Sequence, residues 1–138
     1  MTMTLSVLTP NRTFFEGEIT QISLEGYDGR MVIKPRHTPF VFALKEEGII
    51  TIDTPEGKQY AAIMGGFAEV SGGKITLLTG AAEWPDEIDE ERAISSKERA
   101  LARIKEKKEA HKLDRERAIH SLTRSEIRLK LAIHRTKK

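Results

Sequence analysis

The chain has 138 residues, of which 38% are hydrophobic and 32% charged, and its formal net charge is +2 at pH 7. This length suits one domain, or a compact domain with an appendage. The absence of cysteine excludes disulfides and thiolate metal sites and suits a reducing compartment. No apolar run approaches the roughly 18–20 residues needed to span a bilayer, and no signal-peptide layout precedes the first β-rich run. We therefore expect a soluble, cytoplasmic protein.

The first 84 residues consist of short β-rich runs separated by turn sequences such as "YDG", "PEG" and "SGG". Strands spaced eight to twelve residues apart predict an antiparallel sandwich or barrel. The "GGKIT" segment at 72–76 is interpreted as a hairpin turn, because it lacks the other residues of a phosphate-binding loop. The expected strands are 5–9, 13–19, 19–25, 31–34, 40–44, 49–53, 59–64, 67–70 and 74–79.

The amino-acid composition changes after residue 84, and residues 88–138 contain neither Gly nor Pro. Helices over about 87–107 and 113–135 are predicted, with a turn between them and Asp86 as the first N-cap. Because no Gly or Pro enforces the turn, one unbroken helix is the alternative. Thin apolar stripes predict a weakly docked pair of helices. The stripes are Ile94, Leu101 and Ile104 on the first helix, and Ile119, Leu122, Leu129 and Ile133 on the second.

The two segments carry charges of opposite sign. Residues 1–84 hold 7 Lys/Arg and 10 Asp/Glu, giving −3, whereas residues 85–138 hold 16 and 11, giving +5. This asymmetry indicates two units that face different partners.

No catalytic constellation is visible in the sequence. The histidines are scattered, without a neighbouring acid and nucleophile, and no zinc-type spacing occurs. They are His37, His111, His120 and His134.

The arginines of the helical segment are more informative. Arg92 and Arg99 are seven residues apart, and Arg124 and Arg128 are four apart, so each pair shares a helix face. A folded hairpin would bring the pairs together around an anion such as a polyphosphate. Spacing alone favours the alternative, a solvated basic face. A nucleic-acid-binding module lacks aromatic residues for stacking here, and a β-sandwich enzyme with a helical appendage lacks catalytic residues.

In its order of motifs the whole chain resembles the epsilon subunit of bacterial F-type ATP synthases. The resemblance implies an all-β sandwich of about ten antiparallel strands (residues 1–84) followed by a C-terminal α-helical hairpin (residues 85–138). The motifs that carry it are "VLTP" (7–10), "VIKPRHTPFV" (32–41), "GGFAEV" (65–70), "KITLLT" (74–79) and "IDEERA" (88–93).

The resemblance also implies an ATP site on the folded hairpin. Ile88 and Asp89, with Glu83, are expected to read the adenine and ribose, and the arginines to hold the phosphates. A second-helix pattern of the family fits Arg117, Ala118 and Leu122 as well. The implied ATP-binding residues are Glu83, Ile88, Asp89, Arg92, Ala93, Arg99, Arg124 and Arg128.

The function that the resemblance implies is non-catalytic. The protein would be a rotor subunit that joins gamma to the c-ring and supports rotational ATP synthesis, peripheral to the cytoplasmic face of a bacterial cell membrane. Its hairpin would switch between a folded and an extended state, contact the beta and alpha subunits, and oppose ATP hydrolysis. ATP would be a regulatory ligand, with no cofactor, no metal and no nucleic acid involved. The alternative is a nucleic-acid-binding module that uses the basic helical tail.

Overall fold

The runs of β-branched and aromatic residues form ten strands in the computed structural model, which describes residues 1–36, 38–106 and 112–135. All ten lie in the first of two units, Met1–Glu83, and the second unit is Trp84–Lys138. Each expected run becomes a strand, and β10 adds a short one that was not expected. The strands are β1 (Met3–Leu8), β2 (Thr13–Ile19), β3 (Gln21–Gly26), β4 (Gly29–Ile33), β5 (Phe40–Ala43), β6 (Gly48–Thr54), β7 (Gly57–Ile63), β8 (Phe67–Ser71), β9 (Lys74–Leu78) and β10 (Ala82–Glu83).

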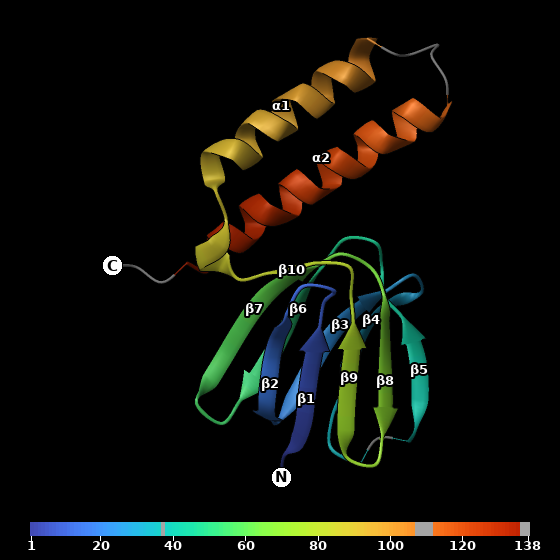
Figure 1. Cartoon of the computed structure of the whole chain (residues 1–138), viewed down its shortest axis with the longest axis vertical. Coiled ribbons are helices and arrows are strands. Elements are labelled where there is room, and N and C mark those ends of the chain that lie inside the picture. Colours follow the sequence, from blue (N-terminus) through green and yellow to red (C-terminus); the bar gives the residue numbers. More distant parts are fainter. Residues whose placement is uncertain (37, 107–111, 136–138) are drawn as a thin grey trace. The chain divides into compact units, whose positions relative to one another are not determined.

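The strands form two five-stranded sheets, in the orders β2-β1-β9-β8-β5 and β10-β7-β6-β3-β4 (Figure 1). Alternate residues of the central strands are fully buried, as the inner faces of a sandwich require. Leu5 and Val7 of β1 and Ile75 and Leu77 of β9 are examples in the first sheet. The predicted β-sandwich is therefore confirmed.

One strand pair departs from the expected antiparallel arrangement. β1 and β9 pair in parallel, with Leu5 opposite Ile75, and they join the antiparallel pairs β1–β2 and β8–β9 edge to edge. Strands joined by a tight turn must be antiparallel, whereas strands from opposite ends of a unit can pair in either sense. The interpretation of "GGKIT" as a turn is confirmed. Gly72 and Gly73 join β8 to β9 with φ of 56° and 77°, as in a type I′ turn.

The second unit begins with a 3-10 turn, η1 (Pro85–Glu87), followed by the helices α1 (Glu90–Glu106) and α2 (Lys112–Ala132). The helices lie side by side and antiparallel (Figure 1). The alternative of one unbroken helix is therefore wrong. Most of the expected inter-helix turn lies outside the described residues, as do His37 and His111. Within the described residues, neither helix is long and apolar enough to cross a lipid bilayer.

The helix ends differ from the prediction in two places. α1 begins at Glu90, three residues after the expected start, because Pro85 opens the separate turn η1 and Ile88 then returns to an extended conformation. α2 ends at Ala132, and residues 133–135 continue as a turn. Asp86 lies inside η1 and does not cap α1; Asp89 does so instead.

The apolar stripes predicted to dock the two helices do not form the buried seam. Ile94 and Leu101 are 44% and 47% exposed, and Ile133 is 79% exposed. Small residues at a seven-residue spacing are buried instead, namely Ala93 and Ala100 on α1 and Ala118 and Ser125 on α2. Small side chains let two helix backbones approach closely along this seam. Leu131 of α2 and Ile88, just before α1, are the large side chains buried in this unit among the described residues.

Candidate anion-binding face of the helical hairpin

Asp89 is the N-cap of α1. Its Oδ1 accepts a hydrogen bond from the backbone N–H of Arg92, at 3.1 Å, and Glu90 and Glu91 add negative charge to the first turn. Carboxylates at this end satisfy free N–H groups and complement the helix dipole. Asp89, predicted to contact a nucleotide, therefore has a structural role in the described state, and its side chain remains exposed.

The backbone of Ile88 is engaged on both sides. Its N–H donates to the carbonyl oxygen of Pro85 at 3.2 Å, and its own carbonyl oxygen accepts a hydrogen bond from Arg135. The side chain of Ile88 is buried, at 3% exposure. A ligand that donates a hydrogen bond to the Ile88 carbonyl oxygen must therefore share that oxygen with Arg135 or displace its guanidinium.

The arginines of α1 lie on one exposed face. Arg92, Ser96, Arg99 and Arg103 recur at intervals of four, three and four residues, which keeps them on one side of a helix. The guanidinium of Arg99 donates to Oγ of Ser96 at 3.1 Å. Ala93, one residue beyond Arg92, is buried in the seam, and its predicted contact with a nucleotide stays a prediction.

The arginines of α2 repeat the same intervals. Arg117, Ser121, Arg124 and Arg128 are separated by four, three and four residues, and Arg124 and Arg128 are partly buried. The two helices share a pocket of about 530 Å³. Its lining residues are Arg103, Asp114, Arg117, Ala118, Ser121 and Arg124. Because this pocket joins Arg103 of α1 to Arg117 and Arg124 of α2, the two basic rows lie on the same face of the hairpin.

Sequence reasoning named Arg117 only as part of the family's second-helix pattern and did not name Arg103, although an internal repeat points to both. Residues 92–103 and 117–128 share the pattern Arg-Ala-Ile-x-Ser-x-x-Arg-x-x-x-Arg. In an antiparallel pair, such a repeat relates the helices by an approximate two-fold axis perpendicular to them. The residue that follows each first arginine is the buried Ala93 or Ala118. The repeat thus specifies both the seam and the basic face.

Glu83 differs from the other predicted site residues because it belongs to the first unit. It is the last residue of β10, where it pairs with Ala62 of β7. The other seven residues of the predicted set belong to the second unit.

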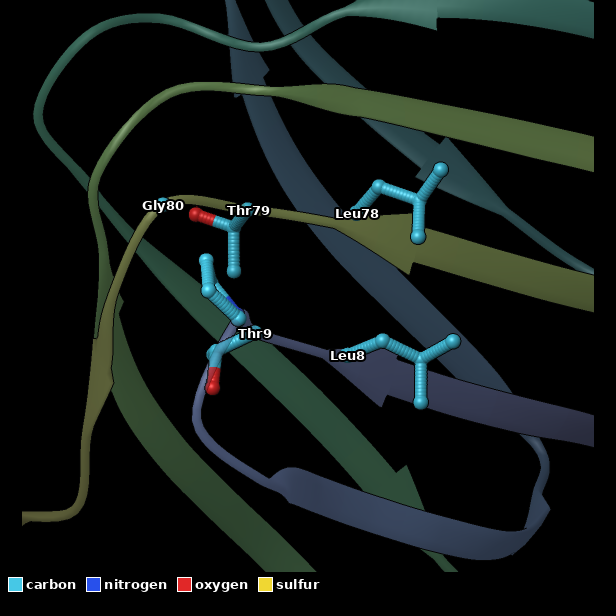
Figure 2. A pocket seen from close by; sticks show the side chains of 6 residues that line it. Leu8, Thr9, Leu78, Thr79 and Gly80 are labelled. Atoms are coloured by element: carbon cyan, nitrogen blue, oxygen red, sulfur yellow. The ribbon is translucent and has the colours of Figure 1, made fainter.

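A second surface lies on the outer side of the first sheet. Leu8 and Leu78 are register partners on β1 and β9, and Leu78 is the partner of Phe67 on β8. Leu78 and Phe67 are 51% and 56% exposed. Figure 2 shows the two leucines beside a shallow pocket of about 440 Å³ that Thr9, Pro10, Thr79 and Gly80 complete. This apolar row (Leu8, Leu78 and Phe67) has the character of a protein-binding surface.

Comparison with known families gives a match for the strand-rich unit. Residues 2–85 match the family model described as "ATP synthase, Delta/Epsilon chain, beta-sandwich domain".

Relatives match over both units. The ATP synthase epsilon chain of Halalkalibacterium halodurans is 37% identical over 131 residues, covering 95% of this chain and 97% of that one. The epsilon chain of Caldicellulosiruptor bescii is 41% identical over 128 residues, covering 93% and 91%. The sodium-ion-specific epsilon chain of Acetobacterium woodii is 35% identical over 107 residues, covering 78% and 80%.

Two solved structures share the fold. A chain of the Euglena gracilis mitochondrial ATP synthase (OSCP/F1/c-ring) superposes with a TM-score of 0.82 at 24% identity, covering 96% of this chain and 82% of that one. A chain of the Tetrahymena thermophila mitochondrial ATP synthase central stalk/c-ring gives 0.54 at 14% identity, covering 96% and 95%.

Proposed function

Because the chain belongs to the family of ATP synthase epsilon chains, we propose that it is a non-catalytic rotor subunit in the central stalk of a bacterial F-type ATP synthase. The observation that carries this proposal is the likeness to named epsilon chains over both the sandwich and the hairpin. In this role the protein joins gamma to the c-ring, sits peripherally on the cytoplasmic side of the membrane and supports rotational ATP synthesis.

The apolar row supplies a surface for a rotor partner. Leu78 and Phe67 each expose about half of their side chain, an arrangement that costs free energy unless a partner covers it. Gamma or the c-ring is the occupant that this role requires.

Leu78→Lys is expected to abolish co-purification of gamma with the protein. Val32→Lys introduces the same charge at an exposed valine of the other sheet and serves as the control. Equal losses of gamma with both variants would contradict the assignment of this surface.

The hairpin supplies a regulatory element that responds to ATP. Asp89 and Ile88, with Glu83, read the nucleoside, while Arg92, Arg99, Arg124 and Arg128 hold the phosphates. A ligand that binds only the folded hairpin stabilises it by about 2.7 kcal/mol at a hundredfold excess over Kd. Because the seam consists of small residues, the free-energy difference between the folded and the extended hairpin is small enough for this ligand to reverse it. Without ATP, the extended hairpin contacts the beta and alpha subunits and opposes hydrolysis.

Isothermal titration of ATP into the full-length protein tests the sensor. Binding at millimolar or lower Kd is expected, and Arg92→Ala or Arg124→Ala should weaken it about tenfold or more, because each removes a charge-assisted contact to phosphate. Arg115→Ala, an exposed arginine outside the pocket, is the control. If the wild-type protein binds no ATP at millimolar concentration, the sensor role is excluded and the rotor role remains.

A further inference from the structure

One segment of the strand-rich part has the opposite charge to its surroundings. Residues 1–84 carry a net charge of −3, yet residues 29–45 contain four Lys/Arg and no Asp/Glu. The rest of residues 1–84 holds three Lys/Arg and ten Asp/Glu, a net charge of −7. The basic residues of the segment are Arg30, Lys34, Arg36 and Lys45.

The fold places this segment along one side of the sandwich. It contains β4 and β5, the end strands of the two sheets, and each of them pairs with only one of the described strands. A bridge between Gly26 and Leu44 brings the residue after β5 to the end of β3, so β4 and β5 lie on the same side (Figure 1). We call residues 29–45 the basic edge. End strands leave backbone N–H and C=O groups with which an added peptide can pair.

The cations of the basic edge form no ion pair with a carboxylate in the part of the chain that the structure describes. The guanidinium of Arg30 donates to the hydroxyl of Ser23 at 2.5 Å and not to Glu25, its register partner on β3. The side chains of Lys34, Arg36 and Lys45 are exposed. Cations arranged in this way attract a surface of opposite charge and accelerate its association.

Arg36 adopts a backbone conformation that favours glycine. Its φ is 69°, and among the described residues no other residue except glycine has a positive φ. Gly72, in the turn between β8 and β9, has a similar φ of 56°. Glycine adopts this conformation without the steric cost that a Cβ imposes. An arginine kept there at that cost indicates a role for its side chain, and because the side chain is exposed, the role is contact with a partner.

The basic edge also exposes an apolar side chain, since Val41 of β5 is 68% exposed. Arginine beside exposed apolar groups is typical of protein interfaces. A free anion would use the cations alone, and an anionic membrane surface would leave the backbone groups of the end strands without partners. The combination therefore favours an extended acidic peptide.

We propose that the basic edge binds an acidic segment of a partner protein, which pairs with β5 and places carboxylates against Lys34 and Arg36. In the proposed rotor role, on which the choice of partner rests, this segment belongs to another subunit of the ATP synthase. The contact differs from that of the apolar row because it depends on charge and weakens with salt.

The affinity of the full-length protein for detergent-solubilised ATP synthase depleted of this subunit tests the proposal. Raising NaCl from about 50 to about 300 mM should weaken wild-type binding about tenfold or more, because salt screens the attraction. The double variant Lys34→Glu, Arg36→Glu should bind about tenfold more weakly than the wild type at the lower salt concentration. As the matched control, Lys58→Glu with Lys74→Glu reverses two exposed lysines of β7 and β9 and should change the affinity less than about twofold.

Arg36→Gly separates the contact from the stability of the fold. Relief of the positive φ should raise Tm in differential scanning calorimetry by about 2–5 °C, while the affinity for the depleted complex falls about threefold or more. A fall in both Tm and affinity would show that Arg36 supports the fold, and it would overturn its role as a contact residue. A higher Tm with unchanged affinity would overturn that role as well.

Three further outcomes would overturn the proposal. Equal losses of affinity in both double variants would indicate a diffuse effect of charge, and the rotor role would stand. Wild-type binding to phosphatidylglycerol vesicles that Lys34→Glu, Arg36→Glu abolishes, with unchanged affinity for the depleted complex, would assign the edge to a membrane surface. If the wild type does not bind the depleted complex at either salt concentration, the rotor role fails together with this contact.

Discussion

Arg135, three residues beyond the end of α2, donates a hydrogen bond to the carbonyl oxygen of Ile88, two residues before α1 begins. The same guanidinium donates to the carbonyl oxygen of Pro85 at 3.4 Å and pairs with the carboxylate of Glu90 at 3.5 Å. One side chain thus joins the last turn of the second unit to its first. These contacts require the two ends of the hairpin to lie together, as they do in the antiparallel arrangement of α1 and α2.

Replacing Arg135 with alanine should loosen the folded hairpin. The partly exposed guanidinium makes two carbonyl contacts and one ion pair, so the expected loss is about 1–2 kcal/mol after allowance for solvent screening. Hydrogen exchange should accelerate at the backbone amides of 88–93 and 130–135. Arg135→Lys should recover only part of the protection, because an ammonium lacks the planar fork that reaches several acceptors at once. If Arg115→Ala accelerates the same amides equally, Arg135 does not join the ends.

The cap formed by Asp89 gives a prediction that separates its structural role from its charge. Asp89→Ala removes the acceptor for the Arg92 amide and should cost about 0.5–2 kcal/mol of helix stability. Asp89→Asn keeps an oxygen that caps, so the first turn of α1 should stay protected from hydrogen exchange. Should Asn prove as disruptive as Ala, the carboxylate charge would be the important feature and not the hydrogen bond to Arg92. Asp86→Ala is the matched control, because Asp86 lies in η1.

The sandwich was predictable because its strands alternate and its turns carry glycine. Runs such as 13–19 and 74–79 match β2 and β9 to within a residue. The start of α1 was less predictable, since Asp86 and Asp89 are both acceptable caps and only the turn opened by Pro85 decides between them. The parallel pairing of β1 with β9 depends on contacts between distant segments, which local patterns do not encode.

The candidate site was predictable in character and only partly in its residues. Arginines at helical spacing indicated a basic face, and the fold does place two rows of them on one side of the hairpin. The seam was missed because Ile94 and Leu101 are the more hydrophobic residues, whereas close approach of two helices selects Ala93 and Ala100. Arg135 was missed because it lies beyond the periodic part of α2, where no spacing rule applies.

The seam of small residues predicts a position-dependent response to a larger side chain. Ala100→Leu should destabilise the hairpin by about 1–3 kcal/mol, because the added atoms must separate two closely packed helices. Ala102→Leu places the same side chain on an exposed site of α1 and should have little effect. Limited proteolysis of the two variants provides the measurement, with faster cleavage within the second unit expected for Ala100→Leu. Similar cleavage rates would mean that the helices do not approach as closely as the burial of Ala100 indicates.

Gly66, in the connection between β7 and β8, should tolerate no side chain. Its φ is 104°, and a Cβ there would lie 1.8 Å from the carbonyl oxygen of Leu78, which is backbone and cannot move aside cheaply. Gly66→Ala should therefore cost more than about 3 kcal/mol, through strain and displacement of β9. In a unit of this size, this loss lowers Tm by roughly 12 °C or more in differential scanning calorimetry. Gly17→Ala in β2 is the control, since its added Cβ would meet nothing closer than the Phe15 ring at 3.5 Å. If the Tm of Gly66→Ala lies within a few degrees of the Gly17→Ala value, the backbone around Gly66 can move to make room for the added Cβ. This result would contradict the close packing of Gly66 on β9.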